Sequence, residues 1–218
     1  MSQLDASVKV RNPRTGVYDR DLAAPTREEL ISTCRRLREN QKDWESAGAN
    51  YRSTILRKWR EAIESRREEF IHALTEDTGR RTESAIEVQV SVDGLSRWAD
   101  LADELLDESD EQVTSLPGIS VAPSIRPFPL VGIISPWNFP LLLALIDAIP
   151  ALAAGCAIVI KPSEITPRFL APLQKTLDDV PEIKKVVALV EGAGETGATL
   201  IQHVDFVCFT GSVETGRI

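Results

Sequence analysis

The sequence predicts an α/β fold, in which a parallel sheet is flanked by helices, with further helices at the N-terminal end and a protruding β-hairpin. Three observations predict it. Residues 1–110 carry the apolar spacing of amphipathic helices, and residues 111–129 are rich in Val, Ile, Pro, Gly and Ser. From Leu130 onward, short apolar runs alternate with helical patterns, which is typical of a parallel sheet.

Two helices are predicted in the region of residues 26–64. Thr26 and Glu29 have the spacing of a capping box, and the apolar stripe that follows consists of Leu30, Cys34, Leu37, Gln41 and Trp44. A second helix is expected to be capped by Asn50 or Ser53. Its buried side is predicted to carry Ile55, Leu56, Trp59 and Ile63.

Two more helices follow. Ser65 is expected to cap a third helix that ends at Gly79. A fourth is predicted from about Thr82 to Glu108, and its inward side is expected to carry Ile86, Val90, Trp98, Leu101 and Leu105. These helices are interpreted as scaffold.

The segment 111–129 is predicted to be a hairpin with Pro117-Gly118 at its turn. Its mixture of polar and apolar residues indicates an exposed ribbon that needs a partner.

Four apolar runs are predicted to form the parallel sheet, and the right-handed crossover rule places the intervening helices on its faces. Thr166-Pro167 is typical of a cap and first turn for the second of these helices. Pro150, inside the first helix, predicts a kink or an early stop there. The runs are Val131–Ile134, Ala157–Ile160, Val186–Val190 and Phe206–Phe209.

Composition excludes several classes of function. The 218 residues carry a formal net charge of −8, which argues against nucleic acid as a partner. No apolar run reaches membrane-spanning length, so no membrane association is expected. The first 13 residues lack the pattern of a signal or transit peptide, which predicts a cytoplasmic protein. Three widely spaced cysteines predict neither disulfides nor a metal site.

The segments after the four predicted strands are all unusual loops. In open α/β sheets, ligands bind beyond the carboxyl ends of the strands. The sequence therefore predicts one composite site at that edge. The four segments are SPWNFP at 135–140, KPSE at 161–164, EGAGETG at 191–197 and TGSVETG at 210–216.

These loops belong to a longer resemblance. VGIISPWNFPLLLALIDAIPALAAG, IVIKPSEITP, GAGETGATL and FTGSVETGRI, in this order, are similar to the motif series of the aldehyde dehydrogenase superfamily. The similarity covers about residues 11–218. It implies a truncated aldehyde dehydrogenase-like fold, in which residues 1–110 and 130–218 form an incomplete Rossmann-like cofactor-binding domain and residues 111–129 an oligomerisation hairpin, with the catalytic domain absent.

Lys161 and Glu164, as an isolated pair, would be interpreted as surface ions at a strand end. The resemblance implies instead that they contact the adenosine ribose, with Ser163 as a further cofactor contact. A carboxylate can accept from both ribose hydroxyls but repels a 2′-phosphate, so Glu164 favours NAD over NADP. Lys161 partly offsets this preference.

Gly192, Gly194 and Gly197 spell G-x-G-x-x-G between a strand and a helix, the pattern of a dinucleotide fingerprint. No acidic residue ends the next strand, which argues against that interpretation. The resemblance places Gly194, Gly197 and Ala198 beside the adenine, where small residues leave room for a flat ring. A simple helix-starting turn is the alternative.

The turn from Gly211 to Gly216 is a near miss for a phosphate-binding P-loop, because Arg217-Ile218 replace the required Lys and Ser/Thr. This argues against nucleotide-triphosphate chemistry. The resemblance implies instead a contact with the pyrophosphate, to which Ser212 would donate a hydroxyl hydrogen bond. The residues assigned to this region are Phe209, Thr210, Gly211, Ser212 and Gly216.

Asn138 suits the role of a helix cap before Phe139-Pro140. The resemblance implies a catalytic role, in which its side-chain amide donates to the oxyanion that forms when a thiolate attacks an aldehyde. A preorganised donor of this kind lowers a barrier by about 3 kcal/mol. The neighbouring residues Ile134, Ser135, Pro136 and Trp137 are expected to line the cofactor.

The family reaction implied by the resemblance is oxidation of an aldehyde through a cysteine adduct, hydride transfer to NAD and hydrolysis of a thioester. Cys34, Cys156 and Cys208 each resemble small core residues, and no triad accompanies His72 or His203. The nucleophilic cysteine and the general-base glutamate are expected beyond Ile218, so the isolated chain is predicted to be inactive. The aldehyde substrate and a homo-oligomer formed through the hairpin are expected for the complete enzyme.

Two alternatives remain open at this point. The chain could be a non-catalytic NAD-binding module, or a subunit that another chain completes. It could also derive from a relative that reduces acyl thioesters or acyl phosphates on the same scaffold.

Overall fold

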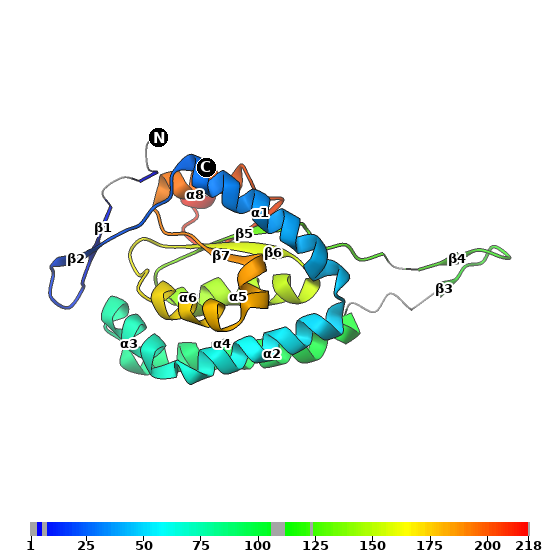
Figure 1. Cartoon of the computed structure of the whole chain (residues 1–218), viewed down its shortest axis with the longest axis horizontal. Coiled ribbons are helices and arrows are strands. Elements are labelled where there is room, and N and C mark those ends of the chain that lie inside the picture. Colours follow the sequence, from blue (N-terminus) through cyan, green and yellow to red (C-terminus); the bar gives the residue numbers. More distant parts are fainter. Residues whose placement is uncertain (1–3, 6–7, 106–111, 123, 218) are drawn as a thin grey trace.

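The computed structural model describes residues 4–5, 8–105, 112–122 and 124–217 (Figure 1). Helices dominate the first half of the chain, and strands alternate with helices in the second. The elements are β1 (Lys9–Arg11), β2 (Tyr18–Asp21), α1 (Arg27–Ser46), α2 (Ala49–Ser65), α3 (Arg67–Thr78), α4 (Arg81–Leu105), β3 (Gln112–Val113), β4 (Ser120–Val121), β5 (Leu130–Ser135), α5 (Pro140–Ala154), β6 (Ala157–Pro162), α6 (Leu170–Asp179), α7 (Pro181–Val186), β7 (Val187–Leu189), α8 (Gly194–Ile201), β8 (Phe206–Phe209) and the 3₁₀ turn η1 (Thr215–Arg217).

The predicted parallel sheet is confirmed. Its strands lie in the order β7-β6-β5-β8, and each neighbouring pair is parallel. Helices α1 and α8 lie on one face, and α5 and α6 cover the other (Figure 1). Helices α2 and α4 form an outer layer against α5, and α3 continues that layer against α4. The sheet is therefore enclosed between two helical faces, as a parallel sheet requires.

The first helix forms as the sequence predicts. Thr26 and Glu29 make both halves of the capping box, and the five residues of the predicted stripe are the buried residues of α1. In α2 the predicted buried side is also confirmed, but the predicted cap is wrong, because Gly48 precedes the helix with φ of +81°. Gly48 therefore supplies a left-handed residue between two helices rather than a side-chain cap.

The third helix ends as predicted but begins differently. Gly79 terminates α3 in the left-handed conformation, with φ of +72°. Ser65 is not its cap, because it is the last residue of α2, where its hydroxyl donates to the carbonyl of Ala62. The helix begins at Arg67 after Arg66.

The predicted inward side of α4 is wrong for Ile86 and Val90, which are exposed at 55% and 41%. Trp98 is half-buried and packs against the core, as expected. The buried stripe runs along a neighbouring side of the helix and includes Val88, Val92, Leu95, Ala99 and Ala102. Glu87 and Ser91 are also buried on this side, so the core-facing stripe is partly polar and apolar spacing alone does not reveal it. Leu101 is half-buried, and the side chain of Leu105 and residues 106–108 lie outside the described residues.

Two features of the helices of the α/β half differ from expectation. Of the kink or early stop expected at Pro150, the early stop is absent, because α5 continues through Pro150 to Ala154 and ends at Gly155. Pro150 removes the hydrogen bond to Ile146, which lies on an exposed part of the helix. Thr166-Pro167 does not begin the next helix, since α6 starts at Leu170. The Thr166 hydroxyl donates instead to the carbonyl of Trp137.

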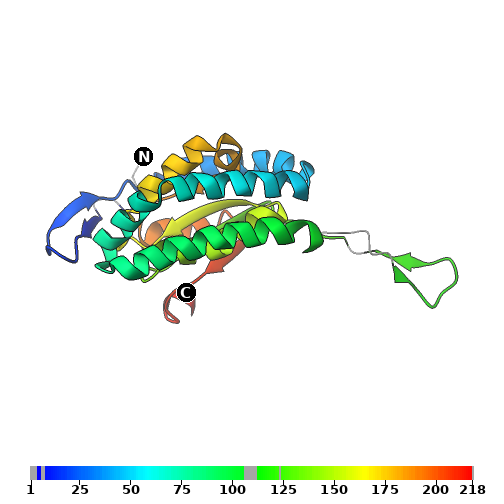
Figure 2. The same ribbon diagram turned by 90° about the horizontal axis from the view of Figure 1, so that it is seen from below.

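The predicted hairpin is present. Strands β3 and β4 pair antiparallel, and Gly118 occupies the turn with φ of +77°. The hairpin extends away from the body of the molecule (Figure 2). Among the described residues, no helix is long and apolar enough to cross a membrane.

Candidate dinucleotide site

Three residues at the carboxyl ends of neighbouring strands lie side by side. Ile134 of β5 is in register with Lys161 of β6 on one side and with Phe209 of β8 on the other. The N–H of Thr210 donates to the carbonyl of Ile134 at 3.0 Å, which extends the β5–β8 pairing by one residue. The loops that follow β5, β6 and β8 therefore start at the same edge of the sheet.

Lys161 and Glu164 lie at the centre of this edge. The Lys161 side chain is 5% exposed, and its Nζ lies 3.9 Å from a Glu164 carboxylate oxygen. Burial lowers the pKa of Lys161, while Glu164 and Asp5 oppose that effect. The ammonium donates to the carbonyl of Pro162 at 3.0 Å. Glu164 is 39% exposed and faces solvent at the end of the strand, where a hydroxyl-bearing ligand can reach it.

The first turn of α8 packs against Lys161. A Cβ on Gly197 would lie 3.7 Å from Lys161 Cδ and 3.9 Å from Ile134 Cδ1. A Cβ on Gly194 would meet nothing within 4 Å, so the space around it is open. Open space at Gly194 is what the predicted adenine subsite requires.

The amino end of α8 is occupied by a carboxylate from the far N-terminal end of the chain. Asp5 accepts hydrogen bonds from the N–H groups of Ala193 (2.8 Å), Glu195 (3.2 Å) and Thr196 (2.8 Å), and from the Thr196 hydroxyl (2.6 Å). Burial raises the pKa of Asp5, but these hydrogen bonds outweigh it and lower the pKa. The N–H groups at the amino end of α8 therefore bind Asp5.

Sequence reasoning missed Asp5, because its partners are about 190 residues away along the chain. Gly192 makes the loop possible, with φ of +147°. A Cβ there would lie 2.2 Å from the Thr196 hydroxyl oxygen, so only glycine fits.

The turn after β8 is compact. Ser212 accepts from the N–H of Thr215 at 3.1 Å, and its hydroxyl donates to Thr215 Oγ1 at 2.9 Å. The Phe209 ring packs on the glycines of the turn, since a Cβ on Gly211 would lie 2.6 Å from it and one on Gly216 3.2 Å. In this conformation the Ser212 hydroxyl stabilises its own turn.

The turn after β5 carries Asn138, the predicted catalytic donor. Capping is not its role, because the N-cap of α5 is Phe139 and no side chain of the cap residue bonds the helix. Asn138 is exposed, and its side-chain amide forms no hydrogen bond with the described residues. The Ser135 hydroxyl is buried and likewise has no partner in the described part of the chain. Trp137 is 55% exposed.

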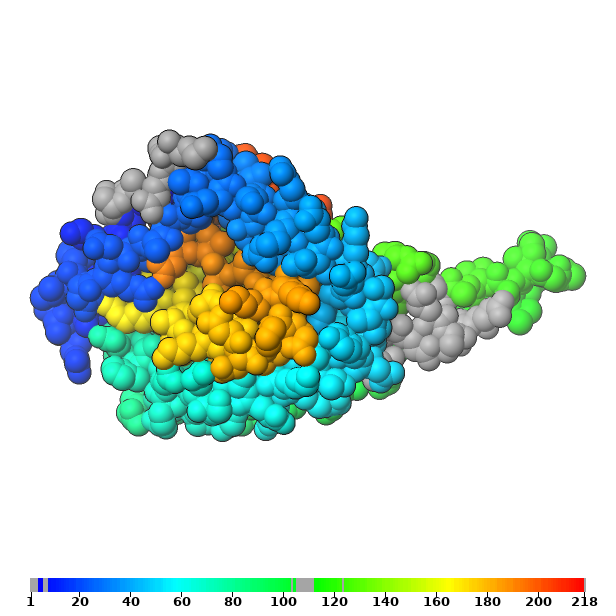
Figure 3. Space-filling model, in the orientation of Figure 1, coloured from blue at the N-terminus to red at the C-terminus, as the bar shows by residue number. Residues whose placement is uncertain are grey.

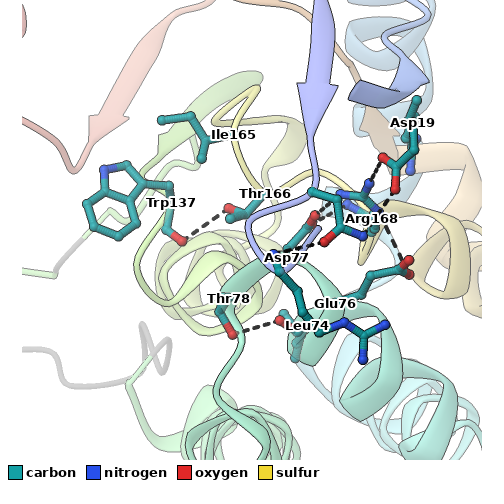
Figure 4. Close-up of polar contacts among 12 residues, drawn as sticks. Asp19, Leu74, Glu76, Asp77, Thr78, Trp137, Ile165, Thr166 and Arg168 are labelled. Atoms are coloured by element: carbon teal, nitrogen blue, oxygen red, sulfur yellow. Dashed lines mark hydrogen bonds and ion pairs between the residues drawn. The ribbon is translucent and has the colours of Figure 1, made fainter. Parts of the chain in front are cut away.

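A buried ion network holds the segment after β6 (Figure 4). The Arg168 guanidinium pairs with Asp77 and Asp19, and it lies 3.8 Å from Glu76. The Arg168 side chain is 9% exposed and that of Asp77 is 1% exposed. Burial raises the pKa of Asp77 in spite of its bonds to Arg168. Through Arg168, the network connects the segment after β6 to Glu76 and Asp77 of α3 and to Asp19 of β2.

The three cysteines do not fit the role of a nucleophile. Cys34 and Cys156 are buried and Cys208 is half-buried. Burial raises the pKa of all three thiols, that of Cys156 to about 11. A reactive cysteine requires a lowered pKa and access to solvent. Among the described residues, no group of His, Cys, Asp and Glu could hold a metal ion.

A surface hollow lies away from the predicted cofactor residues. It has a volume of 540 Å³ between α1, α6 and β7, and none of the predicted cofactor contacts lines it. In Figure 3 its floor is the orange part of the surface between α1 and α6. Of the predicted cofactor residues, Ile134, Lys161 and Phe209 lie instead at the carboxyl ends of β5, β6 and β8.

Comparison with known proteins identifies the family. The sequence model of the aldehyde dehydrogenase family matches residues 1–218. The peroxisomal aminoaldehyde dehydrogenase 1 of Pisum sativum is 34% identical over 94% of this chain and 43% of its own length. The chloroplastic betaine aldehyde dehydrogenase of Amaranthus hypochondriacus is 34% identical over 96% of this chain and 44% of its own.

Solved structures show the same fold. The putative aldehyde dehydrogenase PutA from Anabaena variabilis is 52% identical, with a TM-score of 0.94 over 97% of this chain and 45% of that protein. Betaine aldehyde dehydrogenase from Staphylococcus aureus, solved in complex with NAD⁺, is 29% identical, with a TM-score of 0.88 over 99% of this chain and 45% of that one. The chain thus spans less than half the length of these relatives, and it belongs to the aldehyde dehydrogenase family.

Proposed function

We propose that this chain provides the NAD site and the oxyanion donor of an enzyme that oxidises an aldehyde to a carboxylic acid. The observation that carries the proposal is the alignment of Ile134, Lys161 and Phe209 across three adjacent strand ends, with Gly197 packed against Lys161. Family membership and a structural neighbour solved with NAD⁺ support it.

The residues at this edge fit an adenine dinucleotide. Glu164 accepts from the ribose hydroxyls and disfavours the 2′-phosphate of NADP, while Lys161 supplies a buried donor beside it. The open space at Gly194 takes the adenine. Bound NAD supplies a hydride acceptor. The full set of cofactor contacts in this proposal is Ile134, Ser135, Pro136, Trp137, Lys161, Ser163, Glu164, Gly194, Gly197, Ala198, Phe209, Thr210, Gly211, Ser212 and Gly216.

Asn138 acts on the substrate in this proposal. Its free, exposed amide donates to the oxygen that gains negative charge when a nucleophile attacks the aldehyde carbon. The nucleophile itself is not Cys34, Cys156 or Cys208, whose pKa values are raised by burial. The nucleophilic cysteine and the general base are then supplied from outside these 218 residues, and the chain alone does not turn over aldehydes.

The β3–β4 hairpin is proposed to mediate homo-oligomerisation. It projects from the body of the molecule, and Val113 and Val121 on it are 87% and 59% exposed (Figures 1 and 2). Apolar side chains on an isolated two-stranded ribbon need a partner surface.

In the proposed division, residues 111–129 form this element, and residues 1–110 and 130–218 form the cofactor-binding domain. A cytoplasmic location stays a prediction, because the names of the plant relatives include peroxisomal and chloroplastic enzymes.

Calorimetric titration of the purified chain tests the cofactor site. Saturable binding of NAD, and weaker binding of NADP, are expected. Glu164→Gln removes the charge that repels a 2′-phosphate, so this variant is expected to reduce the preference for NAD by about tenfold. Glu182→Gln on the distant helix α7 is the matched control and is expected to leave both affinities unchanged. A monodisperse wild-type chain that does not bind NAD would contradict the proposal.

A further inference from the structure

The turn that carries Asn138 is held by side chains from two other parts of the chain. The carbonyl of Trp137 accepts from the Thr166 hydroxyl at 3.1 Å (Figure 4). The next carbonyl, that of Asn138, accepts from the guanidinium of Arg80. Hydrogen bonds from side chains therefore hold the carbonyl groups of two successive residues of the turn.

Glu87 fixes the other end of the same turn. Its Oε1 accepts from the N–H groups of Leu141 at 2.7 Å and Leu142 at 2.9 Å. The first turn of a helix leaves such N–H groups without internal partners, and Phe139, the N-cap residue of α5, offers no side-chain acceptor. A carboxylate from α4 thus replaces the local cap and suits the positive end of the α5 dipole.

Burial of the Glu87 carboxyl would be unfavourable without its hydrogen bonds to the N–H groups of α5. Glu87 is 2% exposed and lies on the core-facing side of α4, next to Val88. Burial of a carboxyl is unfavourable unless hydrogen bonds replace water. The two N–H groups of α5 provide those bonds, which gives the carboxyl a reason to lie in the core.

Arg80 and Glu87 lie on the same side of α4, because seven residues correspond to about two helical turns. Arg80 directly precedes the helix, and its carbonyl accepts from the N–H of Ser84 at 2.9 Å. The Arg80 guanidinium also lies 4.9 Å from the centroid of the Phe139 ring. The residue before α4 therefore contacts the turn at the Asn138 carbonyl, and α4 itself contacts it at the N–H groups of Leu141 and Leu142.

These contacts leave the Asn138 side chain free while its backbone is fixed. An oxyanion donor needs this combination, because its contribution depends on being oriented before charge develops. We propose that Arg80 and Glu87 are positioning residues, which together hold the backbone of Asn138 and so fix the place from which its side-chain amide reaches the substrate. The inference rests on the proposed catalytic role of Asn138, and it assigns to α4 a part in the active site.

Nuclear magnetic resonance and hydrogen exchange on the whole chain test this assignment without cofactor. Glu87→Ala is expected to speed amide exchange at Leu141 and Leu142 about tenfold, because two buried donors lose their acceptor. In the same variant the order parameter of the Asn138 backbone N–H is expected to fall, towards values below about 0.6. Arg80→Met is expected to lower that order parameter while Leu141 and Leu142 stay protected.

Two further variants separate positioning from general stability. Glu87→Gln keeps an oxygen acceptor and is expected to restore protection at Leu141 and Leu142. Glu83→Gln changes an exposed carboxyl in the first turn of α4 and is expected to change nothing. The indole N–H of Trp44, which donates to the carbonyl of Leu152 at 2.9 Å, reports whether each variant is folded.

The assignment is overturned if folded Glu87→Ala keeps full protection at Leu141 and Leu142, or if Asn138 is equally ordered in wild type, Glu87→Ala and Arg80→Met. If Glu87→Ala does not fold, Arg80→Met decides the question, because an unchanged Asn138 order parameter in that variant overturns the proposal. Failure of NAD binding would contradict the proposed function and leave these signals unaffected, so the two outcomes are distinguishable.

Discussion

Replacing Glu87 by Gln should change how the stability of the chain depends on pH. Burial raises the pKa of Glu87 from its usual 4.5 to about 7, and the N–H groups of Leu142 and Leu141 and the charge of Arg80 only partly offset this. Because the folded state holds the proton more tightly than the unfolded state, the stability that this group contributes is fully present below about pH 4.5 and is lost as the pH rises through about 7.

The size of the effect follows from the same values. A rise from 4.5 to about 7 corresponds to about 3 kcal/mol of free energy of unfolding. The side chain is 2% exposed, so solvent screening does not reduce this figure substantially. Gln cannot ionise and mimics the protonated form, in which the side-chain oxygen still accepts from Leu141 and Leu142.

Urea unfolding of wild type and Glu87→Gln at about pH 4.5 and about pH 8 measures the difference directly. We expect wild type to lose about 3 kcal/mol more than the variant across this range. Glu83→Gln, on the exposed side of α4, should follow wild type. If wild type and Glu87→Gln lose stability in parallel, a buried ionisable carboxyl at the start of α5 does not control the pH dependence, and the reasoning is refuted.

Three other changes have expected outcomes. Arg168→Met leaves Asp77, which is 1% exposed, without its guanidinium, and should lower the free energy of unfolding by about 3–5 kcal/mol in urea titration; a loss below about 1 kcal/mol would show that the pair contributes little. Thr26→Ala removes the side-chain half of the capping box of α1 and should cost about 1 kcal/mol, most of which Thr26→Ser should restore; equal stability of all three proteins would contradict the role of the cap. Asp5→Ala removes the acceptor of three N–H groups at the start of α8, so amide exchange at Glu195 and Thr196 should quicken about tenfold, whereas unchanged exchange would show that the N-terminal segment does not hold the helix.

Local signals are sufficient to predict some elements of the fold. The capping box and apolar stripe of α1 depend on residues three to four apart, and both can be predicted from the sequence alone. The helix end at Gly79 is predictable from the glycine itself, and the four parallel strands are predictable from short apolar runs that alternate with helical patterns. The strand order then places the loops after β5, β6 and β8 at one edge, so the location of the candidate site follows from topology.

The features that local sequence patterns do not reveal depend on contacts between residues far apart in the chain. The inward side of α4 escapes prediction because Glu87 is buried on it, and only the N–H groups of Leu141 and Leu142 explain why a carboxyl lies there. Thr166 resembles a helix cap, yet its hydroxyl bonds the carbonyl of Trp137, 29 residues away. Asp5 has no local pattern at all, and its partners lie in α8 and the loop before it. Side chains that satisfy distant backbone groups leave no periodic signal in a sequence.

The loops after β5, β6 and β8 and the first turn of α8 are proposed to bind a single adenine dinucleotide. Titrating NAD into the isotopically labelled chain, with the backbone amide signals followed by nuclear magnetic resonance, tests it most directly. The signals of Lys161, Glu164, Gly197 and Ser212 are expected to shift together and to fit one dissociation constant. Shifts confined to the hollow between α1, α6 and β7, or unrelated constants for these four residues, would contradict it.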